Sequence, residues 1–179
     1  MMFVNGFQRW LSRYPTRSEG TLLILGVFFL DVLWSIGVVI SIIIINPIIL
    51  EQSPNQIGVI TLGTFFTIAL TAILEDLVFR IIPLTFVLKR WGVRWPTVCT
   101  LLMGSLIFGL YHGDLTHLAS NLGHVLLQGV GGLAYGVVFI KFSHFGKYTK
   151  SASAIIIMMH LAYDFIILGF LLLISGGAS

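Results

Sequence analysis

Six of the ionisable residues within the apolar stretches of this sequence have the side-chain types of a hydrolytic site. They are Glu75, Asp76, Arg80, His112, His160 and Asp164. An ionisable group near the centre of a bilayer costs roughly 2.5–3.5 kcal/mol, even on the scale that gives the lowest cost. Carboxylates can activate water as general bases, and imidazoles can stabilise an oxyanion or move protons. These residue types therefore predict hydrolytic chemistry inside a membrane.

Spacing within each apolar stretch places several of these residues on common helix faces, because residues four apart in an α-helix lie on one face. Three pairs have this spacing: Asp76 with Arg80, Phe108 with His112, and His160 with Asp164. An ion pair between Asp76 and Arg80 offsets much of the cost of burying both charges, which favours a structural role for them. Glu75 lies about 100° around the helix from Asp76 and has no cation four residues away. It is therefore the better candidate for a general base.

Each residue also has a simpler interpretation when it is taken singly. His112 alone would be a hydrogen-bonded core histidine, and His160 with Asp164 would be a polar clasp between helices. His117 and His144, in or near loops, are not assigned to the site. For Asp31 and His124, support of the site and simple packing remain equally open.

Depth in the bilayer links the six residues. Counted at about 1.5 Å per residue from the basic end of each apolar stretch, the depths are roughly 20 Å for Glu75 and Asp76, 18 Å for Asp164, 25 Å for His112, and 12–14 Å for His160 and Arg80. Asp31 and Gln128 come out at roughly 20 Å, and His124 at about 25 Å. Independent structural residues have little reason to share one polar layer, so the functional prediction rests on the set.

Composition predicts the membrane before any motif does. Of 179 residues, 57% are hydrophobic and only 9% are charged, whereas a soluble domain carries about 25% charged residues. Mean hydropathy is +1.01. No basic cluster is interleaved with aromatic residues on a polar background, which argues against nucleic-acid binding. Cys99 is the only cysteine, so the chain has no intrachain disulfide and no cysteine-based zinc site.

Five apolar stretches are each long enough to cross about 30 Å of hydrocarbon. They cover residues 20–46, 57–88, 96–112, 119–141 and 152–175. The second is too long for one perpendicular helix and must tilt or break near Pro83. In the fourth, Gly129 and the Gly132-x-x-x-Gly136 step predict close helix packing.

Basic residues orient the bundle. They gather before the first stretch, between the second and third, and between the fourth and fifth: Arg9, Arg13, Arg17, Lys89, Arg90, Arg94, Lys141, Lys147 and Lys150. The loops at 47–56 and 113–118 have none. The positive-inside rule then predicts a multi-pass protein of the cell membrane with its N-terminus in the cytosol and its C-terminus outside.

The N-terminal segment predicts an amphipathic helix lying on the cytosolic leaflet. Its apolar residues recur at helical spacing: Phe3, Phe7, Trp10, Leu11 and Tyr14. A disordered basic tail is the alternative. The fold class is thus an all-α, polytopic transmembrane bundle of about five spans, with residues 1–18 as an interfacial helix and 19–179 as a single bundle domain.

The order of motifs resembles the CPBP family of intramembrane proteases, also called Abi or CAAX prenyl protease and bacteriocin-processing proteins. That family has Glu-Glu-x-x-x-Arg, then Phe-x-x-x-His, then His-x-x-x-Asn/Asp, each on its own transmembrane helix. Here these motifs are Glu75 to Arg80, Phe108 to His112, and His160 to Asp164. The resemblance covers residues 57–170. Asp76 replaces the usual second glutamate, and Asp164 stands where asparagine is common.

The resemblance implies hydrolysis of a peptide bond in a membrane-associated peptide or protein, either prenylated and CAAX-like or of leader type. The expected catalytic residues are Glu75, His112, His160 and Asp164, with Asp76, Arg80 and Phe108 in support. Glu75, His112 and His160 could also coordinate zinc. The chain has no His-Glu-x-x-His motif, and a metal-free glutamate mechanism would use the same residues.

Two other functions remain as alternatives. A catalytically silent relative, acting as an immunity or scaffold protein, is suggested by the aspartates at positions 76 and 164. A proton-coupled transporter would also contain intramembrane carboxylates and histidines. It would favour inverted repeats and polar residues spread through the bilayer, and the sequence has neither.

Overall fold

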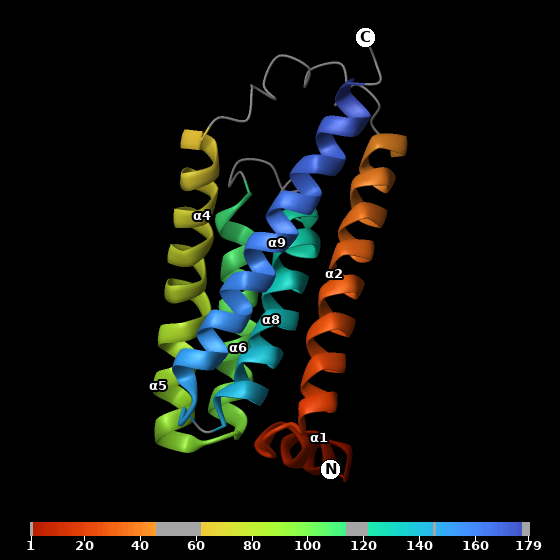
Figure 1. Ribbon diagram of the computed structural model, residues 1–179. Coiled ribbons are helices and arrows are strands. Elements are labelled where there is room, and N and C mark those ends of the chain that lie inside the picture. The colour runs from red at the N-terminus through yellow and green to blue at the C-terminus, as the bar shows by residue number, and fades with distance from the viewer. Residues whose placement is uncertain (1, 46–61, 114–121, 145, 177–179) are drawn as a thin grey trace.

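The computed structural model describes residues 2–45, 62–113, 122–144 and 146–176, and within them all regular secondary structure is helical. Figure 1 shows the helices in chain order. They are α1 (Met2–Ser12), α2 (Arg17–Ile45), α4 (Leu62–Asp76), η1 (Leu77–Ile81), α5 (Ile82–Trp91), α6 (Trp95–Tyr111), η2 (Val125–Gly129), α8 (Val130–Ser143) and α9 (Thr149–Gly176). The segments η1 and η2 are π-helical. The all-α prediction is confirmed for this part of the chain.

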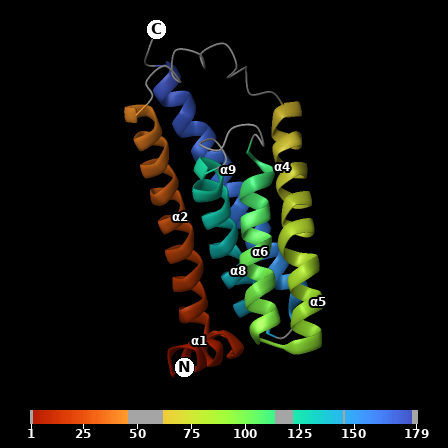
Figure 2. The same ribbon diagram turned by 180° about the vertical axis from the view of Figure 1, so that it is seen from behind.

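The long helices lie side by side, and α1 lies across one end of the bundle (Figures 1 and 2). Helix α8 is the central element and packs against α9, α6 and α2. Its Val138, Phe139 and Ile140 are almost fully buried, and the helix is hydrophobic on every side. A helix of this kind belongs inside a large core or a membrane bundle.

Three helices are long and apolar enough to cross a membrane: Arg17–Ser41, Leu122–Ser143 and Thr149–Leu173. They correspond to the first, fourth and fifth predicted spans. Helix α6 is a shorter apolar helix, and α4 continues through η1 into α5. The polytopic bundle is therefore confirmed, and the total of five spans stays a prediction.

The predicted break near Pro83 takes the form of a π-helical insertion. Proline has no N–H group, so Pro83 cannot donate to the carbonyl of Phe79 four residues earlier. The π-helical segment η1 ends at Ile81, two residues before Pro83, and the Ile82 N–H donates to the carbonyl of Leu77. The chain continues as α5 without a loop, so residues on either side of the insertion stay on one composite helix.

Gly104 on α6 lets the Phe79 carbonyl approach closely. A Cβ atom built on Gly104 would lie 2.8 Å from this backbone oxygen. Because the oxygen belongs to the backbone, only a shift of the backbone would relieve the clash. We expect Gly104→Ala to destabilise the bundle by about 1–3 kcal/mol, the usual cost of overpacking. Thermal unfolding in detergent measures the effect. Gly26→Ala is the matched control, because a Cβ on Gly26 meets nothing within 4 Å; equal stability of the two variants would contradict the prediction.

The glycines of the fourth predicted span do pack closely against α6. A Cβ on Gly136 would clash with the Leu101 side chain, and one on Gly129 would meet the Ser105 carbonyl at 3.1 Å. Gly132 lies against Ser105 and also against the Arg80 side chain. The prediction of close helix packing is confirmed, since these glycines let α6 and α8 approach each other closely.

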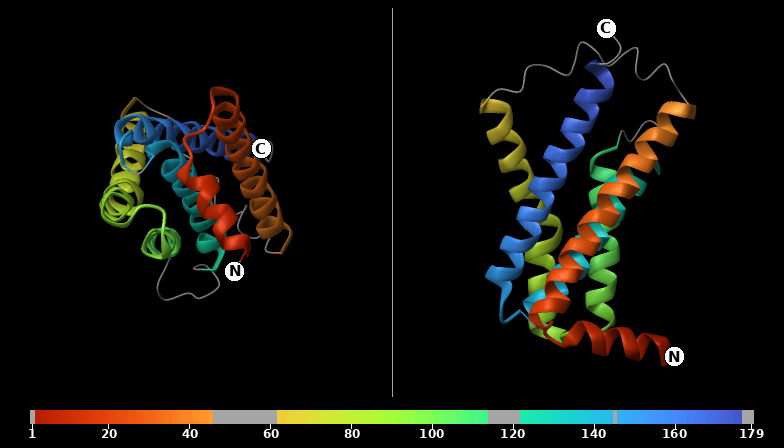
Figure 3. Two further views of the ribbon diagram at one scale, coloured as in Figure 1. Left: turned by 90° about the horizontal axis from the view of Figure 1, so that it is seen from below. Right: turned by 45° about the vertical axis from the view of Figure 1, so that its right-hand side comes forward.

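Helix α1 is attached to the bundle through α8. Leu11 is buried, and Lys141 donates a hydrogen bond to the Trp10 carbonyl while its ammonium lies 4.4 Å from the Trp10 ring centre. The α1–α2, α5–α6 and α8–α9 connections lie at the same end of the molecule (Figure 3), so the three basic clusters gather there. The position of α1 on a membrane surface, the boundary at residue 18 and the cytosolic placement of this end stay predictions.

Candidate active site

The structure brings together all six ionisable residues singled out by the sequence. Four elements contribute them: α4 carries Glu75 and Asp76, η1 carries Arg80, His112 caps the C-terminal end of α6, and α9 carries His160 and Asp164. Asp76, Arg80 and His160 are at most 3% exposed. Chain segments nearly 90 residues apart thus meet at one polar centre among apolar helices.

Asp76 contacts both Arg80 of η1 and His160 of α9. One of its oxygens accepts a hydrogen bond from Arg80 Nη1, as the four-residue spacing predicts. The other oxygen lies 3.3 Å from His160 Nδ1. Arginine is always charged, so Asp76 beside it is an acceptor and the proton on that side of His160 sits on Nδ1. Sequence spacing did not reveal this second contact, because it connects two helices.

The guanidinium group of Arg80 is fixed by aromatic rings as well as by Asp76. Its central carbon lies 4.3 Å from the centre of the Phe108 ring and 5.7 Å from that of Tyr135. Cation–π contacts of this kind are strongest where water is excluded. Gly132 leaves room for the group, since a Cβ there would lie 3.1 Å from Arg80 Nη2. Phe108 therefore supports the cation and not only the following histidine.

Glu75 and His112 form a direct pair. Oε1 of Glu75 lies 3.2 Å from Nε2 of His112, and Nδ1 of the same ring lies 2.9 Å from the Phe108 carbonyl. A carbonyl oxygen only accepts, so His112 Nδ1 must carry a proton and donate. The carboxylate and Nε2 then share a further proton between them. This geometry gives Glu75 a partner that can take up or return charge during a proton transfer.

His160 presents its other nitrogen to two carboxylates at longer range. Nε2 lies 3.9 Å from Oε2 of Glu75 and 3.7 Å from Oδ1 of Asp164. Both distances exceed a normal hydrogen bond, and polar groups this far apart commonly have a water or a ligand atom between them. Nε2 therefore faces the space that Glu75 and Asp164 border.

That space is a cleft of about 340 Å³ between α4 and α9. Glu75, His112, His160 and Asp164 line it, together with three polar side chains that no motif contains: Thr67, Thr71 and Gln128. Ile167, Leu168 and Leu171 make its apolar wall. A cleft with apolar walls and a few convergent polar groups is the usual form of a ligand site. The sequence placed Gln128 at the right depth but gave no sign that it borders the cleft.

Residues 56–166 match the type II CAAX prenyl endopeptidase Rce1-like family. The chain belongs to this family. The match covers more than half of the chain and contains all six ionisable residues and Phe108, whereas α1 and α2 lie outside it. No curated protein and no solved structure matches the chain. Membership in the Rce1-like family implies a protease, and it agrees with the CPBP resemblance that the three motifs carry.

Asp31 and His124, whose roles the sequence left open, differ in their positions in this Rce1-like chain. Asp31 on α2 is 5% exposed and lies against α8, where a Cβ on Gly131 would be 3.0 Å from its Oδ1. His124 lies just before η2 and has a buried Nδ1 without a hydrogen-bond partner among the described residues. Neither residue borders the cleft as described. His117 lies outside the described residues.

The residues suggested for zinc do not form a metal site in the described part of the chain. No group of three or more His, Cys, Asp or Glu side chains there is arranged to hold a metal ion. Glu75 instead contacts His112 directly, and the Phe108 carbonyl occupies the other nitrogen of that ring. Chelation of the purified protein tests whether its activity depends on a metal.

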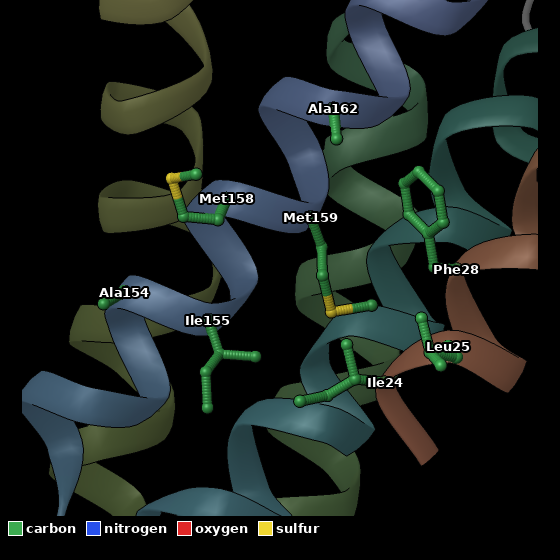
Figure 4. A pocket seen from close by; sticks show the side chains of 8 residues that line it. All are labelled: Ile24, Leu25, Phe28, Ala154, Ile155, Met158, Met159 and Ala162. Carbon is green, nitrogen blue, oxygen red and sulfur yellow. The ribbon is translucent and has the colours of Figure 1, made fainter. Parts of the chain in front are cut away.

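A second pocket of this Rce1-like protein is almost wholly apolar. It has a volume of about 430 Å³ and lies between α2 and α9, and Figure 4 shows its lining side chains. Ile24, Leu25 and Phe28 line it from α2, and Ala154, Ile155, Met158, Met159 and Ala162 line it from α9. It includes none of the six ionisable residues, whereas four of them line the cleft between α4 and α9.

Proposed function

We propose that this Rce1-like chain is an intramembrane endopeptidase in which Glu75 activates the attacking water. The observation that carries the proposal is the position of the Glu75 carboxylate in the α4–α9 cleft. One of its oxygens lies against His112 and the other faces His160 across 3.9 Å. A general base must lie within reach of the proton it takes, directly or through one water, and this carboxylate borders the space where that water would sit.

In the proposed reaction, Glu75 carries one proton from the attacking water to the leaving amine. Glu75 takes one proton from the water as the water oxygen bonds to the scissile carbonyl carbon. The C–N bond of the tetrahedral intermediate then breaks, and the proton passes from Glu75 to the leaving amine nitrogen. His112 supports both transfers, because it shares a proton with the carboxylate through Nε2 and is held by the Phe108 carbonyl through Nδ1.

In the same proposal, His160 stabilises the oxyanion. Its Nδ1 is fixed by Asp76, which Arg80 holds in turn, so Nε2 points to a defined place in the cleft. When both ring nitrogens carry protons, Nε2 donates a hydrogen bond to the negative oxygen that forms. Asp164 stands 3.7 Å from Nε2. An ionised aspartate cannot donate to an oxyanion, so we assign it the orientation of His160 or of the substrate.

The proposed substrate is a peptide segment of a membrane-associated protein, either prenylated and CAAX-like or of leader type. The apolar wall of the cleft, made by Ile167, Leu168 and Leu171, suits such a segment.

We also propose that the bundle lies in the cell membrane and that its basic end, with α1, faces the cytosol. A reporter fused to the end of the chain measures this orientation.

The test is cleavage by the purified protein in lipid or detergent. The panel contains a prenylated CAAX peptide, the same peptide without its prenyl chain, and a membrane-anchored leader peptide. We expect endoproteolytic products, identified by mass, from at least one of them. If a folded preparation cleaves none of the three, the silent-relative alternative is favoured.

Metal dependence is tested in the same assay. Because the described site residues contact one another and form no metal cluster, we expect chelators to leave the cleavage rate unchanged. Elemental analysis of the purified protein should then find zinc well below one ion per chain. A known zinc protease serves as the control for chelation. Loss of cleavage that added zinc restores would contradict this prediction.

A further inference from the structure

A small cavity lies next to the cleft, in the interior of the bundle. It is lined by residues of α2, η1, α6, η2, α8 and α9 and has about 10 Å³ of space open to the centre of a water molecule. A single buried water needs about 10–15 Å³ by this measure, together with two to four polar partners. The cavity therefore has the size for one water and for nothing larger.

Three buried polar atoms belong to residues that line this cavity: Oδ1 of Asp31, Nε of Arg80 and Oη of Tyr135. None has a hydrogen-bond partner among the described residues. The three residues are 5%, 3% and 2% exposed, so bulk water does not reach them. An unpaired buried donor or acceptor costs about 1–3 kcal/mol, more for a charged group, so three at one place call for a common partner.

The three atoms are chemically complementary to one water molecule. The Asp31 oxygen accepts, the Arg80 Nε–H donates, and the tyrosine hydroxyl can do either. A water donates two hydrogen bonds and accepts two, so it can serve all three atoms at once. Gly131 permits this arrangement, because a Cβ there would lie 3.0 and 3.2 Å from the two Asp31 oxygens.

We infer that Asp31, Arg80 and Tyr135 bind one buried water molecule, which makes Asp31 the second anchor of Arg80. Asp76 holds Arg80 through Nη1, and the water holds it through Nε. Helix α2, which lies outside the family match, is thereby linked to the side chain that fixes Asp76 and, through Asp76, His160. Asp31 is then a positioning residue, and only this last step rests on the proposed function.

An experimental structure of the full chain that resolves ordered waters tests the inference directly. We expect one water within about 2.7–3.2 Å of Asp31 Oδ1, Arg80 Nε and Tyr135 Oη. Asp31 and Tyr135 are close enough to interact, so a direct hydrogen bond between them is the competing arrangement. A dry cavity, or that direct bond without a water, would overturn the inference whether or not the protein cleaves any peptide.

Thermal unfolding of variants gives an independent test. Tyr135→Phe and Asp31→Leu each remove a partner of the same water, so we expect their losses in Tm to be non-additive in the double variant. Ser35→Ala is the matched control, since Ser35 lies one turn along α2 and bonds Tyr163 instead. Its loss should add to that of Tyr135→Phe. Additive losses for the Asp31 and Tyr135 pair would contradict the shared water; if Asp31→Leu does not fold, Asp31→Ala takes its place in the cycle.

The positioning role has its own measurement. Asp31→Asn keeps an acceptor for the water, so we expect it to retain most of the cleavage activity. Asp31→Leu should lower kcat with little change in KM, because it disturbs His160 and not the apolar wall of the cleft. Equal kcat in both variants and the unchanged protein would remove the positioning role. If the protein without substitutions cleaves no peptide, the proposed function is contradicted. The experimental structure still tests the water site in that case.

Discussion

Replacing Glu75 with glutamine should lower the rate of peptide cleavage by about 10²–10⁴-fold, the usual contribution of a general base. Glutamine has nearly the same shape but cannot take a proton from water. It can still contact His112, 3.2 Å from Oε1 in the unchanged protein, so the fold should be preserved. The measurement is the single-turnover rate with the best peptide of the panel, together with the thermal unfolding of each variant.

Thr71→Val is the matched control for Glu75→Gln. Thr71 lies one turn earlier on α4, borders the same cleft and has no role in the proposed proton transfers. Its replacement should leave the rate within a small factor of the original. Full activity in Glu75→Gln would contradict the general-base assignment, even if the protein proved to be a protease.

His112→Gln is expected to cause a comparable loss, and the double variant Glu75→Gln/His112→Gln should be little worse than either single variant. Residues that act as one unit give strongly non-additive losses. The direct contact between Glu75 and His112 predicts this behaviour. Multiplicative losses would instead mean that the two residues contribute to separate steps.

The largest expected effect on stability comes from Arg80→Met. Methionine keeps much of the apolar volume but leaves Asp76, which is 0% exposed, without its cation. Breaking a buried ion pair by removing one partner costs about 3–5 kcal/mol. Chemical or thermal unfolding in detergent measures the loss, and the aromatic contacts of Arg80 with Phe108 and Tyr135 add to it.

Two further variants separate lost charge pairing from lost packing. Asp76→Leu/Arg80→Met removes both charges and should recover part of the stability, because apolar replacements of a buried pair are often tolerated. Arg13→Met breaks the exposed pair with Glu19, whose N–O distance is 2.5 Å, and should lower stability far less, because ion pairs at the surface contribute little. If Arg80→Met were no worse than Arg13→Met, Asp76 would not depend on Arg80 for its burial.

These two predictions distinguish the two adjacent carboxylates of α4. Glu75 faces the cleft and His112, and its replacement is expected to act on the reaction. Asp76 faces Arg80 and His160, so replacing Asp76 or Arg80 is expected to affect mainly the stability of the fold and the direction of the His160 ring. Adjacent residues of a helix point about 100° apart, which is why one motif can supply both roles.

Sequence alone determined the fold class and which residues gather. The small share of charged residues required lipid as the outer solvent, and apolar stretches of span length set the helices. The cost of charge in lipid then singled out the few ionisable residues worth explaining. Four-residue spacing correctly gave the Asp76–Arg80 pair, because both partners lie on one helix and their separation is fixed by helix geometry.

Contacts between helices were decided only by the tertiary structure. The Asp76–His160 contact, the place of Gln128 at the cleft and the position of Asp31 beside Arg80 and Tyr135 depend on how α2, α8 and α9 rotate and approach. The π-helical form of the interruption before Pro83 was likewise outside what the sequence specified. Periodicity fixes which face a residue occupies, whereas packing of glycines and large side chains fixes which neighbour that face meets.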